Sequence, residues 1–328
     1  MLFRSAGDLP DLDYSQFDLV LISDIESNTV KYIRESLNTR PLKNYLFALG
    51  GVSLDYTMTD NMIYRPWWCF NILNYNQYQD TDTTSKPFLF DVLLGARRPH
   101  RDFLMARLQM SELLEKSIVT YREVFTGSFA DTGIDTVTAQ ILGNTELQWP
   151  YVSGNLKPEW EVADAVDNTV SYIVPWQIYA NTKYSVIAET KYSNDLFFLT
   201  EKTTKAMFAQ RLFVVFSCKS YLENLRNLGF KTFSNIIDES YDNIEDPGQR
   251  IGAVVSIVEQ LANLTHTQQQ NMRRDLQHIV KHNFDHLFFE LRPVVVAELT
   301  NNIAQALKSQ NIHYNPADLR ELYRLLVN

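Results

Sequence analysis

The sequence contains little cysteine and no long apolar run. Only Cys69 and Cys218 occur among its 328 residues. Two cysteines so far apart in the chain cannot form a disulfide framework or a cysteine-based zinc site, so we expect free thiols in a reducing compartment. No apolar stretch approaches the roughly 18–20 residues that a helix needs to cross a bilayer. These absences predict a soluble, cytoplasmic protein with no membrane partner.

Three motifs of common enzyme classes are also missing. The chain has no G-x-x-x-x-G-K-[ST] phosphate loop, no G-x-G-x-x-G dinucleotide-binding turn and no G-x-S-x-G nucleophile elbow. Each of these motifs places glycine where the backbone must turn sharply or approach a ligand closely. Their absence argues against phosphate-loop phosphoryl transfer, the usual dinucleotide oxidoreductases and serine hydrolases.

The overall charge is acidic, whereas apolar residues are plentiful. The net charge is −9 and the pI is about 5.2, which argues against an overall attraction to nucleic acid but is compatible with a local basic groove. With 45% apolar and 12% aromatic residues, the chain can bury a large core. Its length favours two domains.

Apolar runs of strand length alternate with helix-like patterns. Residues 17–23 and 44–49 read as buried strands that flank a helix at 30–37, which together indicate a βαβ unit. The polar run 80–85 is the expected linker, and we place no elements within 126–170. Further along we expect strands at 86–94, 118–125, 184–188 and 212–216, and helices at 103–108, 200–210, 220–229, 250–263, 268–291, 293–309 and 316–327.

A basic turn follows the strand at 86–94. Arg97, Arg98 and Arg101 surround Pro99 and His100 at the point where an amphipathic helix is expected to begin. Guanidinium groups bind pyrophosphate through paired hydrogen bonds, and a helix N-terminus adds its N–H groups and dipole. The turn therefore predicts an anion site. The alternative is an exposed helix start whose arginines pair with surface acids.

A second charged cluster opens the helix at 200–210. Thr200 is a typical N-cap residue, and Glu201, Lys202 and Lys205 follow it. The lysines and the helix dipole would attract an anion, whereas Glu201 and Glu189, at the end of the preceding strand, could accept hydrogen bonds from sugar hydroxyls. The alternative is a capped helix whose lysines face solvent.

The segments around these two clusters resemble the donor-binding signature of α1,3-fucosyltransferases. The shared features are an acidic strand end at Glu189, then Asn194, a Thr200-Glu201-Lys202 helix start and the apolar strand at 212–216. Exostosin-like transferases look similar in this region. The basic turn, together with residues 228–233, also resembles glycosyltransferase-like proteins encoded by tailed phages. The resemblance covers residues 85–105 and 184–250, less than a third of the chain.

The resemblance implies a GT-B α/β fold, in which two Rossmann-like domains face a cleft, with a helical C-terminal tail. It implies sugar transfer from a nucleotide-diphosphate sugar, with inversion and without a metal. The expected domains are an acceptor-side domain at 1–84, a donor-binding domain at 85–289 and a helical tail at 290–328. The residues implied to bind the donor are Arg97, Arg98 and Arg101 at the pyrophosphate, and Glu189, Asn194, Thr200, Glu201, Lys202 and Lys205 at its sugar, ribose or phosphates.

Two features depart from that signature. Thr203 stands where the family usually has Leu, and Ser217-Cys218-Lys219 occupies a loop in which glycine is common. The resemblance therefore does not name the sugar, and fucose is not implied.

The general base is indicated only by position. Asp55 and Asp60 follow a glycine turn in an aromatic-rich segment and are the preferred bases, with Asp24 and Asp91 as alternatives. Most loop aspartates are turn formers, and this is the competing interpretation of each.

Three classes of function remain open for the acceptor side. A phage-like source would make a hydroxylated (5-hydroxymethyl) base in phage DNA the acceptor, which would require an extruded nucleotide and a basic groove, with Trp67 and Trp68 as stacking residues. A saccharide or other glycan acceptor fits the acidic charge better. A non-catalytic protein that binds nucleotides or carbohydrates would keep the fold without the base.

Three histidines, His278, His282 and His286, fall on one face of the helix expected at 268–291. Such spacing can ligate a metal, but Ile279 occupies the position of the catalytic Glu in a zincin motif. We therefore expect a solvated or packing face.

Overall fold

The chain divides into two compact units. The first comprises Met1–Phe70, Asp195–Leu199 and Leu287–Asn328, and the second comprises Asn71–Asn194 and Thr200–His286. The computed structural model describes residues 2–4, 20–24, 45–49, 51–53, 62–64, 86–125, 174–309, 311, 313 and 315–327. The expected linker at 80–85, the expected helix at 30–37 and the segment 126–170 lie outside these residues.

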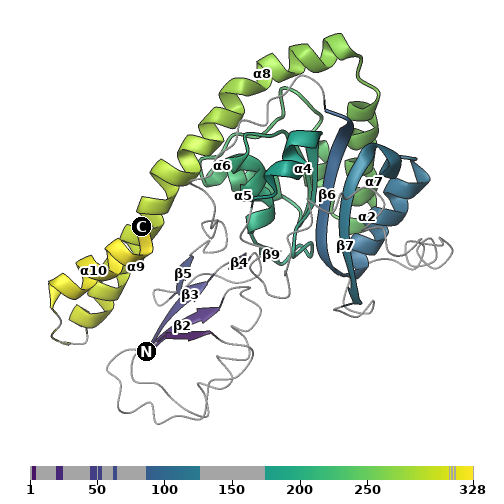
Figure 1. The fold of residues 1–328 in the computed structure, drawn as a ribbon. Helices are drawn as coiled ribbons and strands as arrows, with labels where there is room; N and C mark the ends of the chain where they lie inside the picture. The colour runs from purple at the N-terminus through teal and green to yellow at the C-terminus, as the bar shows by residue number, and fades with distance from the viewer. Residues whose placement is uncertain are drawn as a thin grey trace. The chain divides into compact units, whose positions relative to one another are not determined.

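A four-stranded parallel sheet forms the centre of the second unit (Figure 1). Its strands are β6 (Phe88–Arg97), β7 (Ser117–Phe125), β8 (Thr182–Ala188) and β10 (Phe213–Phe216), in the order β10-β8-β6-β7. Phe90, Val92 and Val214 are fully buried, because a sheet covered on both faces exposes neither side to water. The expectation of an α/β fold with a parallel sheet is confirmed.

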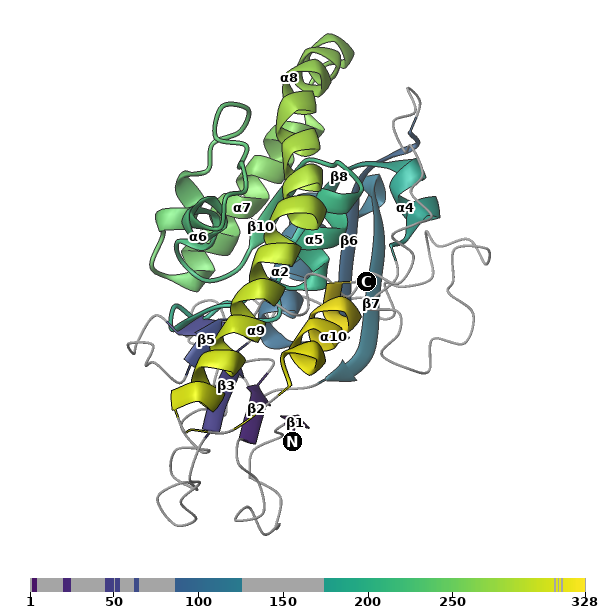
Figure 2. The same cartoon turned by 90° about the vertical axis from the view of Figure 1, so that its left-hand side faces the viewer.

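Helices cover both faces of this sheet (Figure 1). α2 (Pro99–Met110) and α7 (Pro247–Ala262) lie on one face, and α4 (Trp176–Asn181) and α5 (Glu201–Phe208) lie on the other. Figure 2 shows α8 (His266–Asp285) running along α5. Phe208 of α5 packs between Trp176 and Phe284, with ring centroids 5.5 and 5.4 Å away. The unit also contains α6 (Tyr221–Asn227) and the short 3₁₀ helices η4 (Leu114–Lys116) and η8 (Ser240–Asn243).

The direction of the strand order changes between β6 and β8. The chain moves from β6 through α2 to β7 on one side, and from β8 through α5 to β10 on the other. Right-handed crossovers in opposite directions place α2 and α5 on opposite faces of the sheet, which is the arrangement in Figure 1. The adjacent carboxyl ends of β6 and β8 therefore form a topological switch point, where open α/β sheets bind ligands.

The first unit contains a second parallel sheet, in the order β1-β2-β3-β5. Its strands are β1 (Leu2–Arg4), β2 (Val20–Asp24), β3 (Tyr45–Leu49) and β5 (Met62–Tyr64). β4 (Val52–Ser53) pairs with β9 (Leu196–Phe197) in antiparallel fashion. A Cβ atom at Gly51 would lie 2.9 Å from the Phe197 carbonyl oxygen, so this close approach requires glycine.

Helical residues at the C-terminal end also belong to the first unit. From Leu287 onward they form the rest of the π-helix η9 (His286–Leu291), followed by α9 (Arg292–Ser309) and α10 (Pro316–Val327), and α9 contacts β3. None of the described helices combines the length and the apolar content of a membrane-spanning helix.

Sequence periodicity located most of the described elements. The strands expected at 86–94, 118–125, 184–188 and 212–216 correspond to β6, β7, β8 and β10, and the helices expected at 293–309 and 316–327 correspond to α9 and α10. We missed α4, the short strands β1, β4, β5 and β9, and the π-helical break in the helix expected at 268–291. Elements of two to six residues are too short to display a period.

Candidate functional site

The basic turn lies where β6 leads into α2. Arg97 ends β6, Arg98 is the N-cap of α2, and Pro99 is its first residue, a position where the missing proline N–H has no cost. His100 and Arg101 are buried in the first turn of α2, with exposed fractions of 1% and 3%. The turn is therefore not simply an exposed helix start, because two of its polar side chains face the protein interior.

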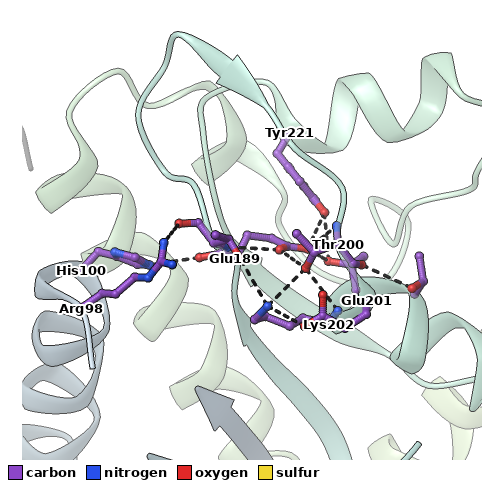
Figure 3. Close-up of polar contacts among 10 residues, drawn as sticks. Arg98, His100, Glu189, Thr200, Glu201, Lys202 and Tyr221 are labelled. Carbon is purple, nitrogen blue, oxygen red and sulfur yellow. Dashed lines mark hydrogen bonds and ion pairs between the residues drawn. The ribbon is translucent and has the colours of Figure 1, made fainter. Parts of the chain in front are cut away.

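Arg98 and His100 connect this turn to the end of β8 (Figure 3). The Nε2 of His100 donates to the main-chain oxygen of Glu189 at 3.0 Å, and the guanidinium of Arg98 donates to the main-chain oxygen of Thr190 at 3.0 Å. The His100 ring also packs on Tyr192, with centroids 4.4 Å apart. The basic turn and the acidic strand end thus meet at the switch point.

Lys202 reaches the same point from α5. Thr200 caps this helix, and its Oγ1 accepts a hydrogen bond from the Lys202 N–H at 3.3 Å. The Nζ of Lys202 donates to Thr190 Oγ1 at 3.3 Å and forms an ion pair with Glu201 at 2.7 Å (Figure 3). Thr190 is therefore contacted by both Arg98 and Lys202, which start from opposite faces of the sheet.

Glu189 is completely buried, and its carboxylate is directed toward hydroxyl groups of the protein (Figure 3). Oε2 accepts from Thr200 Oγ1 at 2.5 Å. Oε1 accepts from Thr203 Oγ1 at 2.6 Å and from the Tyr221 hydroxyl at 2.9 Å. The sequence singled out Glu189 and Thr200 but gave no signal for Tyr221, which approaches from a different helix.

Burial and neighbouring positive charge keep His100 neutral. Burial lowers the pKa of His100 well below its usual value, and the charges of Arg101, Arg98 and Lys202 lower it further. A carbonyl oxygen only accepts hydrogen bonds, so the proton of the neutral ring is on Nε2, which faces Glu189.

The charged groups at the start of α5 influence one another. Burial lowers the pKa of Lys205 to about 8, with Lys202 lowering it further and Glu201 opposing the change. Burial disfavours the ionised form of Glu201, but the charges of Lys202 and Lys205 outweigh this effect and lower its pKa. Glu201 is therefore a carboxylate at neutral pH.

Asn194 connects three loops at the same edge of the sheet. Its Nδ2 donates to the main-chain oxygen and to the side chain of Glu245, both at 2.8 Å, and its Oδ1 accepts from the Lys219 N–H at 3.0 Å. Lys219 and Glu245 also form an exposed ion pair at 2.6 Å. Asn194 thus holds the loops after β8 and β10 against the segment before α7.

Two further buried charges that the sequence did not single out support this edge. Arg250 of α7 is 1% exposed and donates to the main-chain oxygens of Ser217 and Tyr192, each at 2.9 Å. Asp242 accepts from the Leu222 N–H at 2.9 Å and so satisfies the start of α6. The sequence offered one signal for Arg250, because it is an arginine on the otherwise apolar face of α7.

Asp91 does not serve as the general base that its sequence position allowed. It lies within β6 rather than at a strand end, and it is 2% exposed. Its Oδ2 lies 2.7 Å from Arg211 and accepts hydrogen bonds from the hydroxyls of Thr182 and Ser185, each at 3.0 Å. Enclosed and ion-paired, this carboxylate is structural.

The side chains of the other residues predicted on the acceptor side lie outside the described part of the chain. Asp55, Asp60, Trp67 and Trp68 lie outside the described residues, and Asp24 is the last residue of β2. The roles of Asp55 and Asp60 stay predictions from sequence.

Two of the three histidines, one in α8 and one at the start of η9, contact the chain at the end of α6. The Nε2 atoms of His282 and His286 donate to the main-chain oxygens of Gly229 and Leu228, at 2.9 and 2.7 Å. His278 is exposed. Within the described part of the chain, no group of three or more His, Cys, Asp or Glu side chains is arranged to hold a metal ion. This face of α8 therefore packs against the chain near α6.

No protein-family model and no curated protein matches the chain. Three solved structures of α1,3-fucosyltransferase are similar at low identity. The match to the first extends over 82% of this chain and 70% of the fucosyltransferase chain, with 10% identity and a TM-score of 0.40. The match to a structure with GDP-fucose extends over 81% of this chain and 79% of the other, with 8% identity and a TM-score of 0.36. The match to a structure with GDP extends over 80% of this chain and 79% of the other, with 9% identity and a TM-score of 0.32. At these values the function has to be argued from the site itself.

Proposed function

We propose that this chain is a nucleotide-sugar-dependent glycosyltransferase whose donor diphosphate binds at the carboxyl ends of β6 and β8. The observation that carries the proposal is the convergence of Arg98 and Lys202 on Thr190. A diphosphate at this position would meet a guanidinium group, an ammonium group and the N-terminal ends of α2 and α5. The switch point of the sheet is also where such a ligand is expected.

In the proposed reaction an acceptor hydroxyl attacks the anomeric carbon of the donor sugar. The new bond forms as the bond from that carbon to the diphosphate oxygen breaks, so negative charge grows on the departing diphosphate. Arg98 and Lys202 would stabilise that charge, and a base would remove the proton of the attacking hydroxyl. We propose Asp55 or Asp60 as this base. The GT-B arrangement, inversion and metal independence are proposed because the resemblance to fucosyltransferases implies them.

The acceptor is proposed to be a hydroxyl of a glycan or of a hydroxylated base in phage DNA. A DNA acceptor requires a basic surface, and its binding weakens as the salt concentration rises, whereas a glycan acceptor requires no such surface. Transfer assays with oligosaccharides and with 5-hydroxymethylated DNA separate these two acceptors. Donor turnover on either one argues against a purely binding protein.

A thermal-shift panel of UDP, GDP and their sugars tests the donor site. We expect at least one of these nucleotides to raise the melting temperature of the wild type but not of Lys202→Ala. Lys281→Ala is the matched control, since Lys281 is an exposed lysine of α8 that pairs with Asp285 and lies outside the proposed site. Absence of any stabilisation of the wild type, or equal stabilisation of Lys202→Ala, would falsify the proposal.

A further inference from the structure

We infer that Glu189 is a positioning residue of the phosphate site and not a contact of the donor sugar. This inference rests on the proposed function and deepens it, because it separates the groups that bind the ligand from the group that holds them in place. It also reassigns a carboxylate that the family resemblance implied to bind the donor.

The carboxylate of Glu189 has no acceptor position left for a sugar. A carboxylate accepts hydrogen bonds along about four lone-pair directions. Besides the hydroxyls of Thr200, Thr203 and Tyr221, the N–H groups of Thr190 and Thr200 lie 3.2 and 3.4 Å from its oxygens. Because the carboxylate is completely buried, a sugar hydroxyl would have to displace a protein donor and leave it unsatisfied, which is unfavourable.

Glu189 instead links three helices around the site. Its main-chain oxygen accepts from His100 at the start of α2. Its side chain binds Thr200 and Thr203 at the start of α5, and Tyr221 at the start of α6. One residue therefore fixes the ends of the three helices that surround the switch point.

The neighbouring residue is the one on which the cations converge. Thr190 directly follows Glu189, and it accepts hydrogen bonds from Arg98 through its main-chain oxygen and from Lys202 through Oγ1. Displacement of Glu189 would therefore shift Thr190 and both cations. We expect this displacement to weaken phosphate binding without removing any ligand contact.

Thr203 and Tyr221 provide isosteric tests of this role. Their hydroxyls lie 2.9 Å apart, and each also donates to the same oxygen of Glu189. Each hydroxyl carries one proton, so these two hydroxyls can form at most two of the three contacts at a time. Loss of one hydroxyl lets the other keep its bond to Glu189. We therefore expect Thr203→Val and Tyr221→Phe to have smaller effects than Glu189→Gln.

The test is calorimetric titration with inorganic pyrophosphate, with the nucleoside diphosphate that stabilises the protein best, and with its sugar. Glu189→Gln should weaken the binding of all three ligands by the same factor of roughly ten, because misplacement of Arg98 and Lys202 should weaken their contacts by about as much as one charge-assisted hydrogen bond contributes. Thr203→Val and Tyr221→Phe should weaken all three by a smaller common factor. Hydrogen exchange of residues 190–205 should become faster in Glu189→Gln, with or without ligand.

Three results would overturn the positioning role. Glu189→Gln could weaken the binding of the nucleotide-sugar alone, as a contact with the sugar requires. It could leave all three affinities unchanged, as a purely structural carboxylate requires. Its hydrogen exchange at 190–205 could match the wild type. If the wild type binds none of the three probes, the proposed function fails, and the exchange result alone then decides whether Glu189 holds this segment.

Discussion

The imidazole of His100 donates its Nε2 proton to the main-chain carbonyl of Glu189 at 3.0 Å, across a separation of 89 residues in the chain. This hydrogen bond joins the basic turn after β6 to the acidic end of β8. Neither segment by itself distinguishes a binding site from a capped helix. When the two segments meet, Arg98 and Lys202 both donate hydrogen bonds to one residue, Thr190.

Replacing His100 should destabilise the protein in a pH-dependent way. His100→Phe removes the donor to the Glu189 carbonyl and should lower the free energy of unfolding by about 1–3 kcal/mol, whereas His100→Gln retains an N–H donor and should cost less. Urea unfolding at neutral pH measures both. Equal stability of the wild type and His100→Phe would show that this hydrogen bond contributes nothing.

The pH dependence follows from the lowered pKa of His100. The unfolded chain binds a proton on this ring near its usual pKa of 6.5, whereas the folded protein does so only at much lower pH. Below 6.5 the unfolded state therefore holds more protons, and the contribution to stability falls as the pH falls. The stability advantage of the wild type over His100→Gln should be smaller at about pH 5.5 than at about pH 7.5. An advantage that grows on acidification would contradict the assignment.

Lys205 should make anion binding weaken on the alkaline side. Burial lowers its pKa to about 8, so the proposed site loses one positive charge as the pH rises through that value. Nucleoside diphosphate affinity of the wild type should fall through this range, and Lys205→Met should lack the step. An identical pH profile for both proteins would separate Lys205 from the site.

The same pKa shift gives a stability prediction of opposite sign to that for binding. Lys205 loses its proton near pH 8 in the folded protein and near its usual 10.5 in the unfolded chain. Between these values the unfolded state holds more protons, so this group makes the protein more stable as the pH rises. Denaturant titrations of the wild type and Lys205→Met over that range check the sign.

The buried pair of Asp91 and Arg211 should be the most sensitive charged pair in the described core. Arg211→Met leaves the Asp91 carboxylate without its 2.7 Å partner, and breaking a buried pair in this way costs about 3–5 kcal/mol. The double variant Asp91→Leu with Arg211→Met should recover part of this loss. A change below about 1 kcal/mol in Arg211→Met, the range of exposed pairs, would contradict this.

The fold was predictable where the chain alternates between continuous apolar runs and amphipathic stretches. β10 is an unbroken apolar segment because the sheet is covered on both faces, and β6 and β8 are mainly apolar although they contain Asp91 and Ser185. Thr200 and Gly229 are residue types that commonly begin and end helices. The pairing of β4 with β9 was not predictable, because it depends on a contact between residues distant in sequence. Gly51 gives only a turn signal until the Phe197 carbonyl opposite it is known.

The site was predictable as two charged clusters but not as a set of roles. Helix-start chemistry pointed to Lys202, and the arginine turn pointed to Arg98. Sequence could not show that the carboxylate of Glu189 is directed inward, because Thr203 and Tyr221 approach it from two helices. The same limitation applies to Asp91, whose partner Arg211 is 120 residues away.

The most direct measurement is calorimetric titration of the wild type, Arg98→Ala, Lys202→Ala and the Lys281→Ala control with the nucleoside diphosphate that stabilises the protein best. We predict a single site in the wild type and in the control, and a loss of at least roughly tenfold in affinity in Arg98→Ala and in Lys202→Ala, because each variant removes a charge-assisted contact to the diphosphate. Binding of equal affinity in all four proteins, or no binding in any of them, would contradict a donor site at the carboxyl ends of β6 and β8.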